Sequence, residues 1–274
     1  MTTDEIANTF NAGHTEFRAI SSWLWEPLGA ALSEHARPVA GERVLDACCG
    51  AGASAIPTAR DVGPSGQVDA VDVADALLAH GRAEALGLGW LRFHRADVTA
   101  WHAPSGEPYD LVQCGYGVFF LPDMDSGAAH LVAQLRAGGR FAVLTWAEGA
   151  LVAVTGALFE AAGEVHPEPL VPSPSRAAGE RLNSERKLFE WLLTLGLGDV
   201  RTTRVQHTLP LTEEMAWNFA MGSGLRRVLD TVGAAGRARV RDGFLGRLRD
   251  RAITELNAAS LVGVGHRTPQ GAHH

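Results

Sequence analysis

A glycine-rich loop between a predicted strand and a predicted helix has the residue types and spacing of a site for an adenosine-containing cofactor. Residues 44–55 read VLDACCGAGASA, and Gly50 and Gly52 carry no Cβ, so a ligand can lie directly on their backbone. The predicted helix that follows offers free N–H groups at its start. Asp72 ends the next predicted strand, twenty residues after Gly52, where it can accept hydrogen bonds from two ribose hydroxyls.

Asp46 distinguishes between the cofactors that such a loop can bind. A carboxylate at this position would repel the diphosphate of a nicotinamide dinucleotide. The same carboxylate would attract the cationic amino group and the sulfonium of S-adenosylmethionine, which is therefore the expected cofactor. Two alternatives stay open: an NAD(P)-dependent oxidoreductase, because Gly50, Gly52 and Ala55 satisfy the pattern GxGxxA, and a non-catalytic protein that binds S-adenosylmethionine.

The elements that position these residues alternate between strand and helix, which is typical of an α/β fold with a parallel sheet and helices on both faces. The apolar runs predict strands over residues 43–47, 67–73, 91–94, 110–114, 140–145, 199–209 and 257–266. A helix over residues 126–137 is expected to end at Gly138-Gly139. We expect a single domain with an N-terminal helical cover (1–40), a cofactor-binding core (42–148), a lid insertion (149–198) and C-terminal strands and helices (199–267).

Composition narrows the function further. The chain has 274 residues, a net charge of −7 and 46% hydrophobic residues, so it can bury a large core but is unsuited to nucleic-acid or anionic-membrane partners. Its three cysteines do not have the spacing of a zinc site or a disulfide framework, and we expect no metal. The acidic start predicts no signal peptide, and a cytoplasmic location follows as the expectation.

Five ordered motifs give the chain a family resemblance. VLDACCGAG, AVDV, RADV, DLVQCGYGVFFLPD and LRAGGRFAVLTW cover residues 44–146, and together they resemble the class I S-adenosylmethionine-dependent methyltransferases. The resemblance is closest to the small-molecule branch that includes the ubiquinone/menaquinone-biosynthesis type, and it extends to the tail over residues 188–266. It implies a doubly wound, mostly parallel seven-stranded Rossmann-like sheet whose last strand is antiparallel, with N-terminal helices and a helical lid.

The resemblance also implies roles for individual residues. Asp46 would hold the methionine ammonium, Asp72 the ribose, and Asp97 the adenine amino group. At Cys48 the family usually has a glycine, and we interpret the Cys48 and Cys49 thiols as packing groups, since nothing basic nearby would favour a thiolate. The implied cofactor-binding residues are Asp46, Cys48, Gly50, Gly52, Asp72, Val73, Asp97, Val98 and Cys114.

Catalysis and acceptor binding have weaker signals. His14, in the N-terminal cover, and His166, in the proline-rich segment 166–175, are candidate general bases, although an ordinary surface or core histidine is the competing interpretation of each. Tyr116 follows the fourth strand and is a candidate for contacting cofactor or substrate. The candidate substrate-binding residues, which also suit plain core packing, are Trp23, Phe119, Trp146, Trp217 and Met221.

The predicted function is methyl transfer from S-adenosylmethionine to a small, largely apolar or aromatic metabolite, at oxygen, nitrogen or carbon. Acceptors of the quinone or secondary-metabolite type suit the aromatic content of the predicted pocket and the family analogy. A small-molecule acceptor is the expected partner, and the chain is expected to be a monomer or a homodimer.

Overall fold

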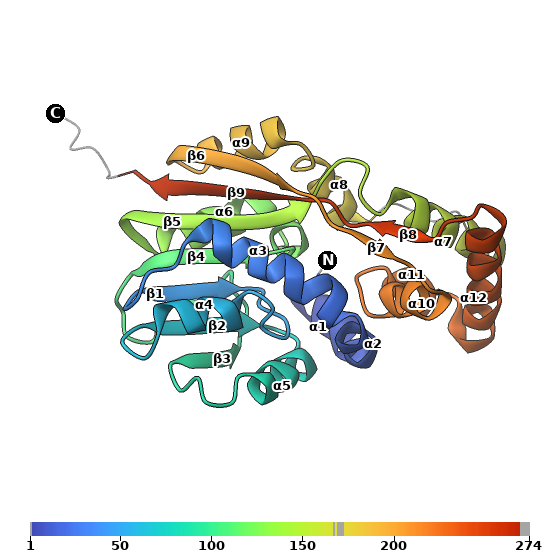
Figure 1. The fold of residues 1–274 in the computed structure, drawn as a ribbon, viewed down its shortest axis with the longest axis horizontal. Coiled ribbons are helices and arrows are strands. Elements are labelled where there is room, and N and C mark those ends of the chain that lie inside the picture. The colour runs from blue at the N-terminus through green and yellow to red at the C-terminus, as the bar shows by residue number, and fades with distance from the viewer. Residues whose placement is uncertain (1, 167, 169–172, 269–274) are drawn as a thin grey trace.

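A seven-stranded sheet forms the centre of the protein, seen in a computed structural model that describes residues 2–166, 168 and 173–268 (Figure 1). The strand order is β3-β2-β1-β4-β5-β9-β6. The strands are β1 (Arg43–Ala47), β2 (Gln67–Asp72), β3 (Leu91–Arg95), β4 (Tyr109–Gly115), β5 (Leu135–Trp146), β6 (Leu197–Val205) and β9 (Ser260–Arg267). Strands β1 to β5 pair in parallel, and β9 runs antiparallel to both β5 and β6. The predicted mostly parallel sheet with a reversed last strand is therefore confirmed.

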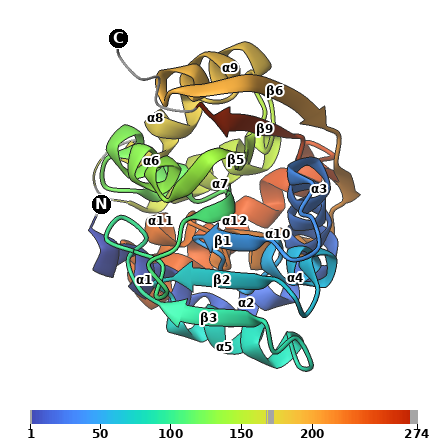
Figure 2. The same ribbon diagram turned by 90° about the vertical axis from the view of Figure 1, so that its left-hand side faces the viewer.

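Helices cover both faces of the sheet (Figure 2). One face packs against α3 (Glu26–Ala36), α4 (Ala55–Val62) and α5 (Asp75–Glu84), and the other against α6 (Met124–Ala133) and α9 (Glu185–Thr194). Successive strand residues point to opposite faces, so Val44 joins the first core and Leu45 the second. Both residues are fully buried, which explains why β1 is apolar after Arg43, apart from Asp46.

A helical cap lies at the carboxyl ends of the parallel strands (Figure 1). It consists of α1 (Thr3–Ala12), α2 (His14–Ala19), the π-helical turn η1 (Ser21–Trp25), α7 (Val152–Val165), α8 (Pro174–Glu180), α10 (Glu213–Met221), α11 (Arg226–Asp230) and α12 (Gly233–Asp250). Within the cap, α10 contacts α2, and α7 packs along α12. The cap thus joins segments from both ends of the chain above the edge where ligands bind in such sheets.

Two details of the predicted elements are wrong. Helix α6 ends at Ala133, and Gly138-Gly139 lies inside β5, next to a register shift opposite Tyr109 and Leu111. Gly138 has a φ of 74°, a value that suits a β-bulge as well as a helix end. The strand predicted over residues 199–209 is divided into β6 and β7 (Thr208–Pro210), and β7 pairs with β8 (Glu255–Asn257) in a separate ribbon. The division falls at His207, whose Nε2 lies 2.9 Å from the Trp23 carbonyl oxygen.

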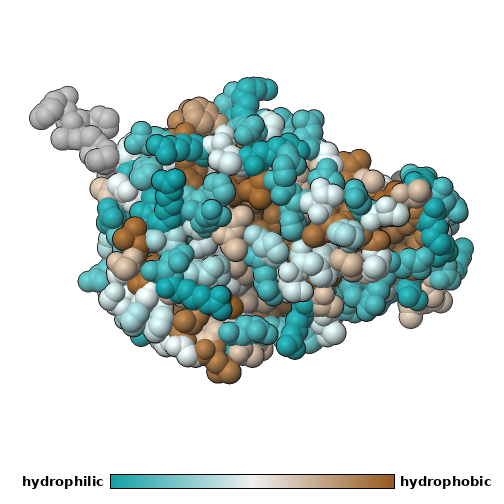
Figure 3. Space-filling view, in the orientation of Figure 1, coloured by the Kyte–Doolittle hydropathy of each residue, from teal (hydrophilic) through white to brown (hydrophobic). Residues whose placement is uncertain are grey.

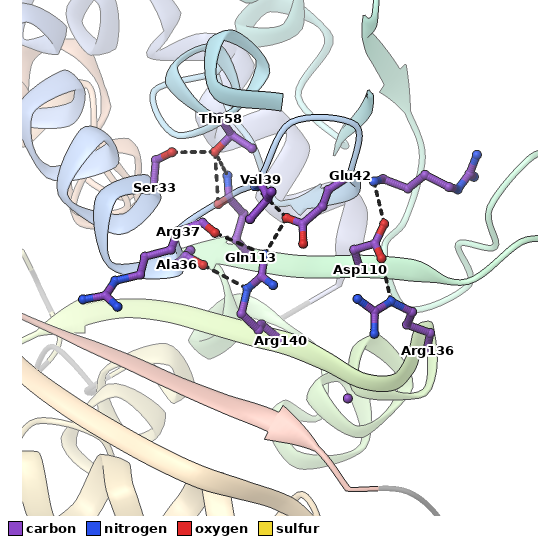
Figure 4. A network of polar contacts seen from close by, with 12 residues as sticks. Ser33, Ala36, Arg37, Val39, Glu42, Thr58, Asp110, Gln113, Arg136 and Arg140 are labelled. Carbon is purple, nitrogen blue, oxygen red and sulfur yellow. Dashed lines mark hydrogen bonds and ion pairs between the residues drawn. The ribbon is translucent and has the colours of Figure 1, made fainter. Parts of the chain in front are cut away.

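A polar network at the amino edge of the sheet anchors α3 (Figure 4). Asp110 accepts a hydrogen bond from the Arg43 backbone N–H (2.8 Å) and another from Arg136 Nε (2.6 Å). Arg140 Nε donates to the Ala36 carbonyl oxygen at 3.0 Å. The end of α3 is thereby fixed to β5 at the amino edge, and Trp25, which directly precedes α3, lies toward the opposite edge.

The surface in Figure 3 mixes polar and apolar residues over the face shown, with the apolar ones interrupted by hydrophilic neighbours. Exposed large apolar side chains are scattered over several elements, as at Leu86, Val152 and Leu193. Among the described residues, no helix combines the length and the apolar character that a membrane crossing requires.

Candidate active site

Asp46 is a fully buried carboxyl group, and its two oxygens differ in their hydrogen bonding. Its Oδ2 accepts hydrogen bonds from Ser54 Oγ (2.7 Å) and Gln113 Nε2 (2.8 Å). Gln113 also bonds to Thr58, whose hydroxyl lies 2.8 Å from that of Ser33 (Figure 4). Among the residues that the structure describes, none bonds to Asp46 Oδ1. Burial raises the pKa of Asp46 to about 7, so the site favours a bound cation beside this group.

The loop after β1 is organised by Asp72. Gly50 N–H donates to Asp72 Oδ2 and Ala74 N–H to Asp72 Oδ1, each at 2.8 Å. Burial raises the pKa of Asp72 more than these bonds lower it. Cys48 and Gly50 have φ angles of 55° and 54°, in the region that glycine adopts without strain, which explains the glycine that the family usually has at residue 48. A Cβ on Gly52 would lie 3.0 Å from the Phe93 ring, so the loop packs closely against β3 at this glycine.

Asp97 is covered by the N-terminal helix. Its Oδ2 accepts a hydrogen bond from the Thr3 hydroxyl, and its Oδ1 accepts one from the Thr99 hydroxyl, both at 2.7 Å. Burial raises the pKa of Asp97, but the hydrogen bonds from Thr99 and Thr3 outweigh burial and lower it. Val98 is buried next to it, and Val73, after Asp72, is half-buried. The residues implied for adenine and ribose thus lie on adjacent strand ends, β2 and β3.

The Cys48 and Cys49 thiols are protonated at neutral pH. A hydrogen bond with Cys114 and burial hold the pKa of Cys48 well above its usual value, and burial does the same for Cys49. Cys114 is buried at the end of β4. Gly117 fits tightly against this pair, because a Cβ there would lie 2.4 Å from Cys48 Cβ and 2.7 Å from Cys114 Sγ.

We therefore expect Gly117→Ala to destabilise the protein by roughly 1–3 kcal/mol, the usual cost of overpacking a core. Gly163→Ala is the matched control, since a Cβ at this position of α7 meets nothing within 4 Å. The control should be neutral or stabilising by up to ~1 kcal/mol. Urea denaturation measures both free energies of unfolding, and equal stability of the Gly117→Ala variant and the wild type would contradict the tight fit.

The candidates Tyr116, which follows β4, and Trp146, the last residue of β5, form a stacked ring pair with ring centroids 4.1 Å apart. The Tyr116 hydroxyl oxygen lies 2.5 Å from Ser260 Oγ, and burial raises the pKa of Tyr116 far above its usual value. Tyr116 has a φ of 54°, a strained conformation for an aromatic residue, and such strain concentrates at functional sites. Trp25 lies 5.8 Å from Tyr116 between ring centroids, and Phe17 stacks on Trp25 at 5.2 Å.

The two candidate histidines lie in different environments. His14 Nδ1 is 2.9 Å from Nε2 of His80 on α5, so it fastens α2 to the core. Burial and the nearby His14 and Arg18 lower the pKa of His80. His166 follows α7, and its Nδ1 lies 2.7 Å from the Glu168 carbonyl oxygen. Part of the proline-rich segment predicted as a lid, residues 167 and 169–172, lies outside the described residues.

The other substrate candidates lie on several different elements of the fold. Phe119 is buried, stacks obliquely on Phe120 and lines a pocket of about 240 Å³ between the 3-10 turn η2 (Val118–Phe120) and α8. Trp217 lies against the Arg241 guanidinium, 5.9 Å from the ring centroid. Met221 is buried at the end of α10, and Trp23 contributes its carbonyl to His207. Tyr116 and Trp146 are thus the candidates that the structure brings together. Phe17, which joins this pair through Trp25, was missed as a site residue.

The fold and the site define an α/β protein built to bind a cationic adenosine cofactor, and comparison with known proteins agrees. Residues 44–139 match a family model described as a methyltransferase domain. The chain also shares its fold with the magnesium protoporphyrin IX methyltransferase of Synechocystis PCC 6803, solved with bound SAH. That likeness has a TM-score of 0.58 and 12% identity, and covers 97% of this chain and 99% of the other.

Curated relatives extend this similarity. Aklanonic acid methyltransferase DauC from Streptomyces sp. (strain C5) is 33% identical over 142 residues, which cover 50% of this chain and 63% of the relative. A 2-phytyl-1,4-naphtoquinone methyltransferase from Synechococcus elongatus is 35% identical over 147 residues, 52% of this chain and 60% of the relative. The chain thus spans less than two thirds of the length of these relatives. The resemblance to S-adenosylmethionine-dependent methyltransferases is confirmed, and it is carried by residues 44–139, which match a methyltransferase domain.

Proposed function

We propose that the protein transfers a methyl group from S-adenosylmethionine to a small, largely apolar or aromatic metabolite, at oxygen, nitrogen or carbon. The observation that carries this proposal concerns Asp46, a buried carboxyl group behind a glycine loop. Its Oδ1 has no hydrogen-bond partner among the described residues. A buried carboxylate gains most from a cation that completes its contacts, and S-adenosylmethionine offers an ammonium and a sulfonium. An anionic diphosphate would meet repulsion in the same place.

The chain's own residues supply binding, orientation and exclusion of water. S-adenosylmethionine, when bound, supplies the electrophilic methyl group. In this proposal Asp46 and the Cys114 carbonyl hold the methionine ammonium, Asp72 holds the ribose, and Asp97 holds the adenine amino group. Cys48, Gly50, Gly52, Val73 and Val98 line the cradle. The half-buried rings of Tyr116 and Trp146 limit the access of water to the reaction site and align the acceptor, which is most of what methyl transfer asks of an enzyme.

A base is needed only where the acceptor must lose a proton as it reacts. The Tyr116 hydroxyl stays protonated because of its raised pKa, so we assign the Tyr116 ring, and not its hydroxyl, to contacting the acceptor. His14 and His166 remain the proposed bases for acceptors that require one.

The acceptor class is supported by the relatives as well as by the rings. Their names refer to aklanonic acid and to a phytyl-naphthoquinone, and the small-molecule acceptor proposed here is of that quinone or secondary-metabolite type. A monomer or homodimer in the cytoplasm completes the proposal, in keeping with three free cysteines.

Calorimetric titration with S-adenosylmethionine, S-adenosylhomocysteine and NADPH in parallel tests the cofactor. We expect micromolar binding of the two adenosyl-sulfur ligands and none of NADPH, followed by a mass gain of one methyl group on an acceptor. Binding of NADPH alone would overturn the proposal in favour of an oxidoreductase. Tight binding of S-adenosylmethionine without methylation across a panel of aromatic acceptors would favour a non-catalytic binding protein.

A further inference from the structure

We propose that Trp25 and the stacked pair Tyr116–Trp146 form the subsite for the acceptor, and that this acceptor is a flat aromatic molecule with a hydrogen-bond-accepting oxygen on its ring system. The Trp25 indole N–H is the group that recognises this oxygen. This inference rests on the proposed methyl transfer and names the acceptor class at the same site.

Aromatic rings form a continuous cluster over the carboxyl edge of the sheet. Each ring of the cluster lies within 6.5 Å of another, measured between centroids. The members are Phe10, Phe17, Trp25, Tyr116, Phe119, Phe120 and Trp146. The cluster adjoins the cofactor loop, since a Cβ on Gly50 would lie 3.6 Å from the Phe17 ring. Offset stacking between flat rings is favourable, so a flat aromatic acceptor can take the place of one ring in such a stack.

Trp25 differs from three other tryptophans, each half-buried or buried, in the use of its N–H. Trp90 donates to the Ala59 carbonyl oxygen (2.5 Å), Trp101 to the Tyr109 hydroxyl (3.1 Å), and Trp191 to Asp125 (2.8 Å). The Trp25 Nε1 atom is buried, yet within the described parts of the chain it has no hydrogen-bond partner. A buried donor without a partner is costly and uncommon in native proteins.

The missing partner must be an acceptor, because an indole N–H can only donate. A carbonyl, ether or phenolic oxygen meets this requirement, and a cationic or purely hydrocarbon ligand does not. The ring stack selects for flatness, and the indole N–H selects for an oxygen on the ring. Together they define the acceptor class more narrowly than apolar content alone.

Tyr116 is fixed so that its ring face, rather than its hydroxyl, is available. Its hydroxyl is engaged with Ser260, and Ser260 Oγ also donates to the Ala258 carbonyl oxygen at 3.0 Å. The strained backbone at Tyr116 holds the ring against Trp146. The ring pair therefore has a defined orientation against which a second flat ring can stack.

Equilibrium dialysis of 2-hydroxy-1,4-naphthoquinone and of naphthalene tests the subsite, with the protein saturated with S-adenosylhomocysteine. Trp25→Phe keeps a ring and removes the N–H, so it should weaken binding of the hydroxynaphthoquinone roughly threefold to tenfold and leave naphthalene binding unchanged. Trp90→Phe, just before the start of β3, where the indole N–H donates to the Ala59 carbonyl oxygen, is the matched control and should change neither. Trp146→Ala removes the stacking partner and should weaken both probes.

The inference would be overturned if Trp25→Phe bound the hydroxynaphthoquinone as tightly as wild type, or if it weakened binding of both probes equally. Full binding of the probes by Trp146→Ala would overturn it as well. Binding of S-adenosylhomocysteine without either probe would also overturn it, and the proposed methyl transfer would stand. Failure to bind S-adenosylhomocysteine would instead count against the proposed function. Should Trp25→Phe fail to fold, as judged by its melting transition, the Trp146→Ala measurement still decides whether the ring pair binds flat aromatic molecules.

Discussion

Replacing Asp72 by alanine is expected to raise the dissociation constant for S-adenosylmethionine at least about tenfold. Each hydrogen bond to a charged group contributes ~1.5–3 kcal/mol, and ~1.4 kcal/mol corresponds to tenfold in affinity. The substitution also removes the acceptor that fixes the Gly50 N–H, so the cradle loses its shape as well as its ribose contact. Isothermal titration calorimetry with S-adenosylmethionine and S-adenosylhomocysteine measures the effect on both ligands.

The control for this variant is Asp75→Ala. Asp75 lies three residues further on, is largely exposed and faces Arg82 at 3.7 Å, so its loss should leave binding unchanged. The melting temperature of both variants separates a lost contact from a lost fold. Unchanged affinity in a folded Asp72→Ala protein would remove Asp72 from the ribose site.

A second large effect is expected at Asp46. Its pKa of about 7 means that a cationic ligand must draw the carboxyl group into its charged form, so the affinity for S-adenosylmethionine should rise as the pH increases from about 6 to about 8. Asp46→Asn cannot ionise, and we expect it to weaken binding at least about tenfold at pH 8, since it loses one buried charge pair. Calorimetry across this pH range, on both proteins, measures the change.

The same substitution should raise the free energy of unfolding of the ligand-free protein, although it weakens binding of the ligand. A carboxyl group whose pKa is raised on folding stabilises the folded state at low pH, and this contribution is lost as the pH rises toward 7. Without ligand, Asp46→Asn should therefore be increasingly more stable than wild type as the pH rises from about 4 to 7. Because Asp46→Asn does not ionise at this position, any pH dependence of its binding shows how far titration of the ligand itself contributes. Parallel pH profiles of the two proteins, for binding and for unfolding, would contradict the assignment of Asp46 as the buried acid of the cofactor site.

The sheet was predictable because its strands are short apolar runs between polar turns, and because the motif acids sit where strands end. Asp46 and Asp72 follow from this spacing, and Asp97 follows from the family resemblance. The bulge at Gly138-Gly139 was not predictable, since a glycine pair after a helix has the same local pattern as a helix terminator. The β7–β8 ribbon depends on where two distant strands part from the sheet, which no local pattern records.

The acceptor side was less predictable than the cofactor side. Tyr116 and Ser260 meet because β9 inserts between β5 and β6, a pairing between residues 144 positions apart. That the Trp25 Nε1 atom is buried without a hydrogen-bond partner among the described residues depends on packing in three dimensions, and a sequence shows only that tryptophans are present. Aromatic content therefore indicated a ring-lined pocket without identifying its members.

The N-terminal segment from α1 to η1 has a kinetic consequence. Thr3 covers the acid implied for adenine, Phe17 lies over Gly50, and Trp25 belongs to the ring cluster. In the proposed function, one stretch of about two dozen residues thus covers both the cofactor side and the acceptor side of the site. We therefore expect substitutions in this segment to change the release rates of the cofactor and of the acceptor together.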